Sequence, residues 1–260
     1  MFNITPVVRN LLIINVVVFF LQNLNFGFAE YWFALHPILG PSFKPHQFVT
    51  YMFLHGGFGH LFSNMLGLFF FGPLLEQQVL GTKRFVIFYF VTGIGAGFLY
   101  TAISYFEMIQ LKNAVDLYAQ YPSPDAFLDF VTRFAPEVKR AAFDFLNNFE
   151  DQPKNLAYIK ESVDFVKQMY EQRLDVPMLG ASGAIFGIIA AFGLIFPNME
   201  MMMLFFPVPI KAKYFVTFYA LYELYAGINI KDSGVAHFAH LGGMIFAYIM
   251  LKVWRIRRMY

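Results

Sequence analysis

The chain has 260 residues, of which 58% are hydrophobic and only 14% are charged, against roughly 25% charged residues in soluble domains. Its 35 phenylalanines and mean hydropathy of +0.53 exceed what a soluble domain of this size can bury, so we expect a lipid bilayer as its solvent. The absence of cysteine excludes disulfides and cysteine-ligated metals. The net charge of +2 argues against nucleic acid as a main partner.

Six apolar stretches are long enough to cross a bilayer, which takes about 17–25 residues. They lie at residues 8–26, 58–79, 84–106, 180–197, 212–228 and 237–254. The first has no basic segment before it and no small-residue cleavage site after it, so we expect a retained span and not a signal peptide. The sequence therefore predicts an all-α polytopic membrane protein, with residues 1–260 forming a single membrane domain.

Basic residues in the short loops predict the orientation, because Lys and Arg gather on the cytoplasmic side. Lys83 and Arg84 follow the second span, Lys211 and Lys213 follow the fourth, and further basic residues follow the sixth. We therefore expect these loops and both termini to be cytoplasmic, in a membrane that we expect to be the bacterial inner membrane. The loops after the first, third and fifth spans would lie on the extracytoplasmic side.

Residues 107–178 differ from the rest, with 12 of the 17 acidic residues and 8 of the 19 basic ones. Ser123 and Pro124 have the pattern of a helix start. Apolar residues then recur at spacings of three and four, as on one face of a helix: Phe127, Phe130, Val131, Phe134 and Val138, then Leu156, Ile159, Val163, Val166 and Tyr170. We expect an extracytoplasmic insertion of two or three amphipathic helices. Their apolar faces could pack on each other, on the membrane surface or over the span ends, and the first is the simplest.

Polar side chains near the extracytoplasmic ends of three spans are the functional candidates, since polar groups are costly in lipid. His60 and Asn64 share a helix face at the start of the second span, and His237 and His240 share a face at the start of the sixth. Ser182 opens the fourth. We expect these three helix ends to line one wet cavity.

This set contains the groups that acyl transfer needs. A serine hydroxyl becomes nucleophilic when a base takes its proton, and imidazole is the usual base because it titrates near neutral pH. The oxyanion needs fixed donors, which the amide of Asn64, a ring N–H of His60 and the backbone N–H of Ser182 could supply. Gly180 and Gly183 keep side chains away from an approaching substrate backbone.

Each residue taken alone has a simpler interpretation. A lone Ser182 between glycines is more often a helix-packing residue, and His55 or His60 alone would be a hydrogen-bonded interfacial histidine. The histidines of the sixth span could ligate a metal, but no His-Glu-x-x-His pattern exists, so no metal or other cofactor is predicted. Glu76 and Glu223 could anchor loops by hydrogen bonds, and Glu223 could instead face the interior of the bundle.

Three segments together resemble the rhomboid intramembrane serine proteases. The family pattern is His-x-x-x-Asn on the second core helix, Gly-x-Ser-Gly at the start of the fourth and Ala-His-x-x-Gly on the sixth. These motifs read here His60 to Asn64, Gly180-Ala181-Ser182-Gly183, and Ala239-His240-Leu241-Gly242-Gly243. The order of the three motifs, the helices that carry them and their expected side of the membrane agree with the family. The resemblance implies a six-helix rhomboid-like bundle, to which this chain adds the insertion at 107–178.

The resemblance also implies roles. Ser182 would be the nucleophile and His240 the base, forming a dyad without an aspartate. His60, Asn64 and the Ser182 backbone N–H would form the oxyanion hole, with Gly180, Gly183 and Gly243 in support. His55 would be a supporting histidine, and Glu76 a structural glutamate that holds the loop after the first span.

The leading function hypothesis is an intramembrane endopeptidase that cuts single-span membrane proteins near the extracytoplasmic surface, with the lipid bilayer as its other partner. Helices with Gly or Pro would be preferred substrates, because a peptide bond must leave its helix to be attacked. The alternative is a catalytically silent rhomboid-like protein that binds transmembrane helices. A channel or transporter is disfavoured, because it predicts more charged residues within the spans than this chain has beyond Glu223.

Overall fold

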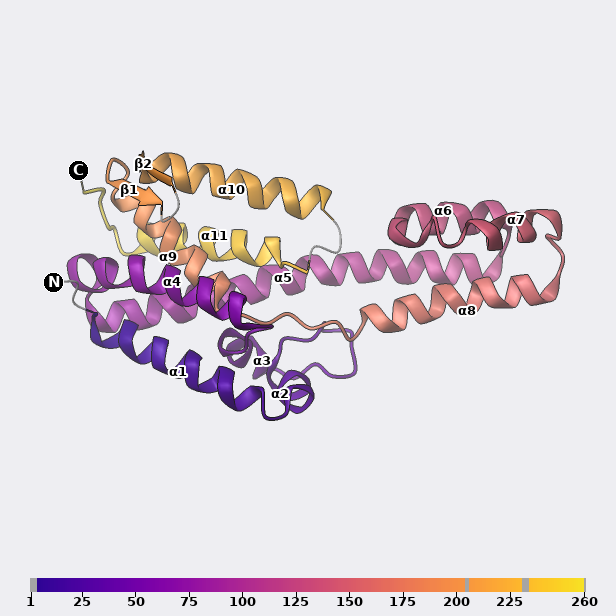
Figure 1. Ribbon diagram of the computed structural model, residues 1–260, viewed down its shortest axis with the longest axis horizontal. Helices are drawn as coiled ribbons and strands as arrows, with labels where there is room; N and C mark the ends of the chain where they lie inside the picture. Colours follow the sequence, from indigo (N-terminus) through magenta and orange to yellow (C-terminus); the bar gives the residue numbers. More distant parts are fainter. Residues whose placement is uncertain (1–3, 204–205, 231–233, 260) are drawn as a thin grey trace. The chain divides into compact units, whose positions relative to one another are not determined.

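The computed structural model of this protein describes residues 4–203, 206–230 and 234–259. Apart from one short hairpin, the described residues are helical or lie in loops (Figure 1). The chain folds into two compact units. The first comprises the residues up to 36, 42–103 and those from 177 onward, and the second comprises 37–41 and 104–176.

Most elements belong to the first unit. Its helices before residue 81 are α1 (Pro6–Gln22), α2 (Phe26–Phe33), α3 (Gln47–Thr50), the 3₁₀ turn η1 (Tyr51–Phe53), α4 (Phe58–Leu75) and the π-helical turn η2 (Glu76–Leu80). Its later elements are α9 (Ser182–Ile195), β1 (Glu200–Met203), β2 (Phe206–Lys211), α10 (Ala212–Asn229) and α11 (His237–Val253). The long helix α5 (Gly81–Gln120) contributes residues 81–103 to this unit and 104–120 to the other.

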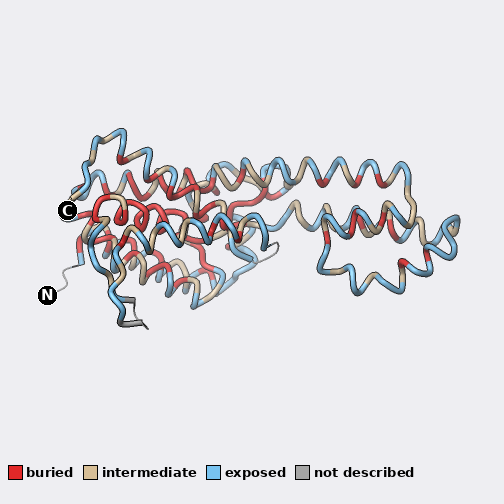
Figure 2. The backbone as a smooth tube through the Cα atoms, turned by 90° about the horizontal axis from the view of Figure 1, so that it is seen from above, coloured by how far each residue is buried: buried red, intermediate tan, exposed pale blue. Residues whose placement is uncertain are grey.

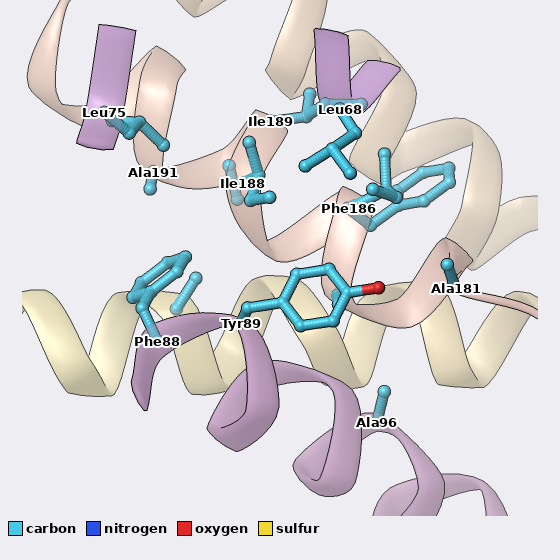
Figure 3. Packing of buried hydrophobic residues seen from close by; sticks show 14 of the residues in the cluster. Leu68, Leu75, Phe88, Tyr89, Ala96, Ala181, Phe186, Ile188, Ile189 and Ala191 are labelled. Carbon is cyan, nitrogen blue, oxygen red and sulfur yellow. The ribbon is translucent and has the colours of Figure 1, made fainter. Parts of the chain in front are cut away.

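Helix α9 is the centre of the first unit. It contacts α4, α10 and α11, and almost all of its residues are buried. Figure 3 shows its side chains Phe186, Ile188 and Ile189 among Leu68 of α4 and Tyr89 of α5. A helix that is apolar on every side is stable only when neighbours surround it. Because α9 is enclosed in this way, the residues at its two ends have fixed positions.

The hairpin of β1 and β2 contains the two strands found among the residues that the structure describes. The strands pair antiparallel, with Glu200 opposite Lys211. Pro207 and Pro209 lie in β2, and proline disrupts a helix but is tolerated in an edge strand. The chain between α9 and α10 therefore turns as a hairpin.

The second unit consists of the end of α5 with α6 (Pro124–Phe134), the 3₁₀ turn η3 (Pro136–Val138), α7 (Phe143–Asp151) and α8 (Leu156–Arg173). Ser123 caps α6 by accepting a hydrogen bond from the Ala126 backbone N–H at 3.2 Å, and Pro124 is its first residue, as expected. Phe127, Phe130 and Val131 are buried in a core that α5, α7 and α8 complete. In Figure 2 buried and exposed segments alternate along these helices.

The expectation that the amphipathic faces pack on each other is therefore confirmed. Leu156 is an exception, because it is 80% exposed at the first residue of α8. The third apolar stretch also does not end its helix at residue 106. Residues 107–120 contain no Gly or Pro and favour helix, so α5 continues to Gln120 and ends just before Pro122.

Among the described residues, one helical run, Phe58–Gln120, contains a stretch long and apolar enough to cross a membrane. The apolar helices α1, α9 and α11 are shorter, at 10–17 residues each. A bundle of six spans is thus not established by these criteria.

Candidate active site

Ser182 is the first residue of α9 and is half-buried. The segment before it is fixed by backbone hydrogen bonds: Leu35 and Met178 exchange two of 2.8 Å, and the Gly180 N–H donates to the Tyr51 carbonyl at 2.9 Å. The first N–H groups of a helix have no acceptor within it and carry the positive end of its dipole. The hydroxyl of Ser182 therefore lies beside backbone donors that are suited to an anion.

His240 lies in the first turn of α11 and faces Ser182. Its Nε2 is 2.9 Å from the Ser182 Oγ, and the residue is 7% exposed. This contact requires α9 and α11 to touch, and a Cβ on Gly243 would lie only 1.8 Å from the Gly183 carbonyl oxygen. Gly183 and Gly243 thus let the two helices approach closely enough to join the hydroxyl and the imidazole.

Phe186 fixes the plane of the His240 ring. Their ring centroids are 4.0 Å apart and their planes differ by 4°, while Tyr219 of α10 packs on Phe186 with centroids 4.7 Å apart. Phe186 was not predicted from the sequence as part of the site. It lies four residues after Ser182, on the same helix face, but nothing distinguished it from the other apolar residues of α9.

His60 lies in the first turn of α4, next to Ser182. A Cβ on Gly180 would lie 2.8 Å from the His60 Nε2 and 3.7 Å from the Ser182 Oγ, and Gly180 has a φ of +132°. Gly180 therefore has both the backbone angle and the space that only glycine provides. Asn64 follows one turn along α4, is 5% exposed, and its Nδ2 has no hydrogen-bond partner among the described residues.

Glu223 comes from α10 and binds both histidines of α11. Its Oε2 accepts from the His240 Nδ1 at 2.9 Å and from the His237 Nδ1 at 2.6 Å. The sequence left open whether Glu223 anchors a loop or faces the interior, and the structure places it in the interior at 3% exposure. Ligand atoms of these three residues lie within 4.8 Å of one another, so the three could also hold a metal.

His55 supports the loop before α4. It is fully buried, its backbone N–H donates to the Gln22 Oε1 at 3.0 Å, and its carbonyl accepts from the Gln22 Nε2. Its ring centroid lies 5.1 Å from that of His60. Burial, with a smaller contribution from the charge of His60, lowers the pKa of His55 to about 4. Gln22 was not predicted from the sequence, because its residue type and its position in an apolar stretch gave no distinctive signal.

Glu76 lies apart from the other candidates, at the opposite end of α4 from His60. The 16 positions between them correspond to about 24 Å of helix. Its carboxylate accepts from the backbone N–H groups of Val7 and Val8 at 3.2 Å each. Glu76 therefore caps the first turn of α1. These contacts differ from the expected role, because they hold the start of the first helix and not the loop after it.

Comparison with known proteins bears on this arrangement. The rhomboid domain model matches residues 42–111 and 157–256, which is more than half of the chain. The unmatched residues 112–156 fall within the second unit.

Two curated relatives come from yeasts. The chain is 27% identical over 219 residues to an uncharacterized mitochondrial rhomboid protein of Schizosaccharomyces pombe, covering 82% of this chain and 52% of the relative. It is 36% identical over 83 residues to the mitochondrial rhomboid protein 1 of Saccharomyces cerevisiae, covering 32% of this chain and 23% of that protein. The chain thus spans about half the length of the first relative and less of the second. Both relatives are mitochondrial, so they do not support the expected bacterial inner membrane. The domain match, together with the sequence motifs that meet at Ser182, shows that this chain is a membrane protein of the rhomboid family.

Proposed function

We propose that this protein is a serine endopeptidase that cuts transmembrane helices, with Ser182 as nucleophile and His240 as general base. The observation that carries this proposal is the 2.9 Å contact between the Ser182 Oγ and the His240 Nε2 at the N-terminal end of α9. Rhomboid membership alone leaves open whether a member is active. A hydroxyl in hydrogen-bond contact with an imidazole, beside the backbone donors of a helix start, is the arrangement that acyl transfer requires.

The proposed reaction has two stages. The Ser182 Oγ attacks the peptide carbonyl carbon while its proton passes to the His240 Nε2. The Ser182 N–H, the Asn64 Nδ2 and His60 stabilise the resulting oxyanion. His240 then gives the proton to the leaving amine, and a water activated by the same imidazole releases the acyl group from Ser182.

A lipid-embedded bundle of six helices, α1, α4, α5, α9, α10 and α11, is part of the proposal. Helix α10 supports it, because its most exposed large side chains form a stripe at spacings of four and three: Tyr214, Phe218, Leu221, Tyr225 and Ile228. Such a stripe is unfavourable in water and favourable in hydrocarbon. The buried residues of the same helix are Ala212, Glu223 and Ala226, so α10 directs its one carboxylate toward the protein and its largest side chains outward.

The proposed substrates are single-span membrane proteins whose helices carry Gly or Pro near the extracytoplasmic surface. Ser182, His60 and His240 lie in the first turns of α9, α4 and α11, where water reaches more readily than at mid-span. A residue that weakens helix formation lowers the free energy needed to expose one peptide bond to Ser182.

The test compares wild type with Ser182→Ala and His240→Ala in proteoliposomes, using a model transmembrane substrate and a serine-directed fluorophosphonate probe. We expect wild type to cut the substrate and to be labelled at Ser182, and both variants to lose both activities. Cleavage by either variant would contradict the proposed dyad. Folded wild type that is neither labelled nor active would instead identify a silent, helix-binding rhomboid-like protein.

A further inference from the structure

Glu223 completes a continuous chain of contacts that ends at the nucleophile. The Ser182 Oγ meets the His240 Nε2 at 2.9 Å, and the His240 Nδ1 meets the Glu223 Oε2 at 2.9 Å. The carboxylate is buried at 3% exposure, and α9, α10 and α11 each supply one member. The rhomboid resemblance implies a dyad without an acid, so this carboxylate is a departure from the implied dyad.

The contacts of Glu223 assign the proton positions on His240. An ionised carboxylate only accepts hydrogen bonds, so the ring nitrogen that faces it carries the proton. With Nδ1 protonated, the Nε2 of a neutral His240 has a free lone pair directed at the Ser182 hydroxyl. This is the tautomer that a general base needs, and the other tautomer would present an N–H to the hydroxyl.

His237 strengthens the same arrangement. Its Nδ1 lies 2.6 Å from the Glu223 Oε2, so one carboxylate oxygen accepts from two imidazoles. A carboxylate in a buried site is costly unless donors surround it. The second donor therefore helps to keep Glu223 ionised and in place beneath His240.

We infer that Glu223 is the positioning carboxylate of a Ser182–His240–Glu223 triad, an inference that rests on the proposed peptidase function. When the Ser182 Oγ–carbon bond forms, the serine proton moves to the His240 Nε2. The Glu223 carboxylate stabilises the cationic ring without taking a proton, and the proton leaves Nε2 with the departing amine as the peptide C–N bond breaks. Glu223 acts through His240, which it orients and whose charge it balances.

The distances favour hydrogen bonds over a shared metal. Two ligands of one tetrahedral zinc at about 2.0–2.1 Å lie roughly 3.3 Å from each other. The Glu223 Oε2 is closer than that to both ring nitrogens, at 2.6 and 2.9 Å. These separations are typical of charge-assisted N–H···O bonds.

The test measures the labelling rate of Ser182 by a small fluorophosphonate, which reports acylation without binding of a helical substrate. In Glu223→Gln we expect labelling to fall roughly 10²- to 10⁴-fold, with kcat for a transmembrane substrate reduced much more than KM changes. Glu223→Asp keeps the carboxylate and should recover about tenfold or more of the loss. His237→Gln leaves the contact between Glu223 and His240 in place and should label faster than Glu223→Gln.

A matched control is Glu76→Gln. Glu76 is also a buried carboxylate, at 2% exposure, but it caps α1 and lies far from Ser182. We expect this variant to lower the melting temperature, while the labelling rate per folded molecule stays within a few-fold of wild type.

The outcomes separate the two proposals. If Ser182→Ala or His240→Ala still cuts, the proposed function fails and the triad fails with it. If both variants are inactive while Glu223→Gln labels at the wild-type rate, only the triad is overturned. Equal losses in Glu223→Gln, Glu223→Asp and Glu76→Gln would also overturn it, in favour of a structural role. So would loss of wild-type labelling to a zinc chelator with recovery on adding zinc.

Discussion

Phe186 lies face to face with His240, with ring centroids 4.0 Å apart and planes within 4° of each other. Phe186 belongs to α9 and His240 to α11, and Tyr219 of α10 also packs on Phe186. The aromatic ring therefore restricts His240 to rotation in its own plane. Glu223 and Ser182 then oppose this in-plane rotation, because each contacts one of the two nitrogens of the His240 ring.

We therefore predict that Phe186→Leu lowers kcat more than it changes KM. Leucine retains apolar contact but no longer provides a flat surface, and a misplaced catalytic group can cost up to about 10²-fold in rate. Phe186→Tyr keeps the ring and should remain within a few-fold of wild type. Fluorophosphonate labelling of folded protein measures the effect, and equal rates for the two variants would show that stacking does not position His240.

Gly180→Ala should abolish labelling of Ser182. Alanine is strained at a φ of +132°, and its Cβ would lie 2.7 Å from the His60 Cε1, so the loop or His60 must move. Gly59→Ala in the first turn of α4 is the control, because a Cβ there has no neighbour within 4 Å. Wild-type labelling of Gly180→Ala would mean that the position of His60 does not matter for acylation.

Gly243→Ala should separate α9 from α11 and lower the melting temperature in detergent. The added Cβ would meet the Gly183 carbonyl oxygen at 1.8 Å, which is backbone and cannot rotate away. Gly242→Ala is a graded comparison, because its tightest contact is 3.0 Å from the Ala96 Cα. We expect a loss of several kcal/mol for the first variant and about 1–3 kcal/mol for the second, as for overpacked cores. The reverse order of melting temperatures would contradict the helix contact described.

His55 should make the fold less stable in acid. Its pKa is about 4 in the folded protein against 6.5 when it is exposed. Between these values the unfolded chain binds a proton that the folded chain excludes, so stability falls as the pH drops from 6.5 toward 4. The slope from this group is at most about 1.4 kcal/mol per pH unit.

The measurement for His55 is the melting temperature at about pH 7.5 and about pH 5, for wild type and His55→Gln. Glutamine has no charge to gain, so the variant should lose less stability between the two conditions. An equal loss in both proteins would assign the acid sensitivity to other groups.

The hydrogen bond between Tyr118 and Ser162 allows the stability of the second unit to be tested independently of the candidate active site. The Tyr118 hydroxyl donates to the Ser162 Oγ at 2.6 Å, and both residues are buried. Ser162→Ala leaves a buried tyrosine hydroxyl without its acceptor, at a cost of about 1–3 kcal/mol. The double variant Tyr118→Phe/Ser162→Ala removes both polar groups and should regain most of that stability in thermal unfolding. If it is no more stable than Ser162→Ala, the hydrogen bond is not the cause.

Much of the site could be predicted because its chemistry is carried by rare residue types in an apolar chain. Ser182, His60 and His240 each lie in the first turn of a helix, and hydropathy located those helix starts within a few residues. The glycines were equally visible, since Gly180, Gly183 and Gly243 match short motifs. The physical need for glycine at these positions appeared only in the structure. Gly180 has a positive φ, and Gly183 and Gly243 lie where two helices touch.

The partners of these residues could not be predicted, because contacts between distant helices leave no local pattern. Glu223 was conspicuous as a charge in an apolar stretch, yet its spacing from His240 gave no reason to join them. Glu76 is a second example, because a hydrogen-bonding role was expected for it, but its partners on α1 are 68 and 69 residues away. The length of α5 was misjudged because hydropathy marks where a lipid-compatible segment ends, whereas helix propensity decides where the helix ends.

Ribosomes synthesise α9 and α10 before α11, because α11 follows both in the chain. His240 follows Ser182 by 58 residues and lies in the last helix that the structure describes. A ribosome-bound chain that has completed α9 but not α11 holds the hydroxyl without its base, and Glu223 without either imidazole. Under the proposed mechanism, the nascent protein would then remain inert until α11 packs against α9 and α10.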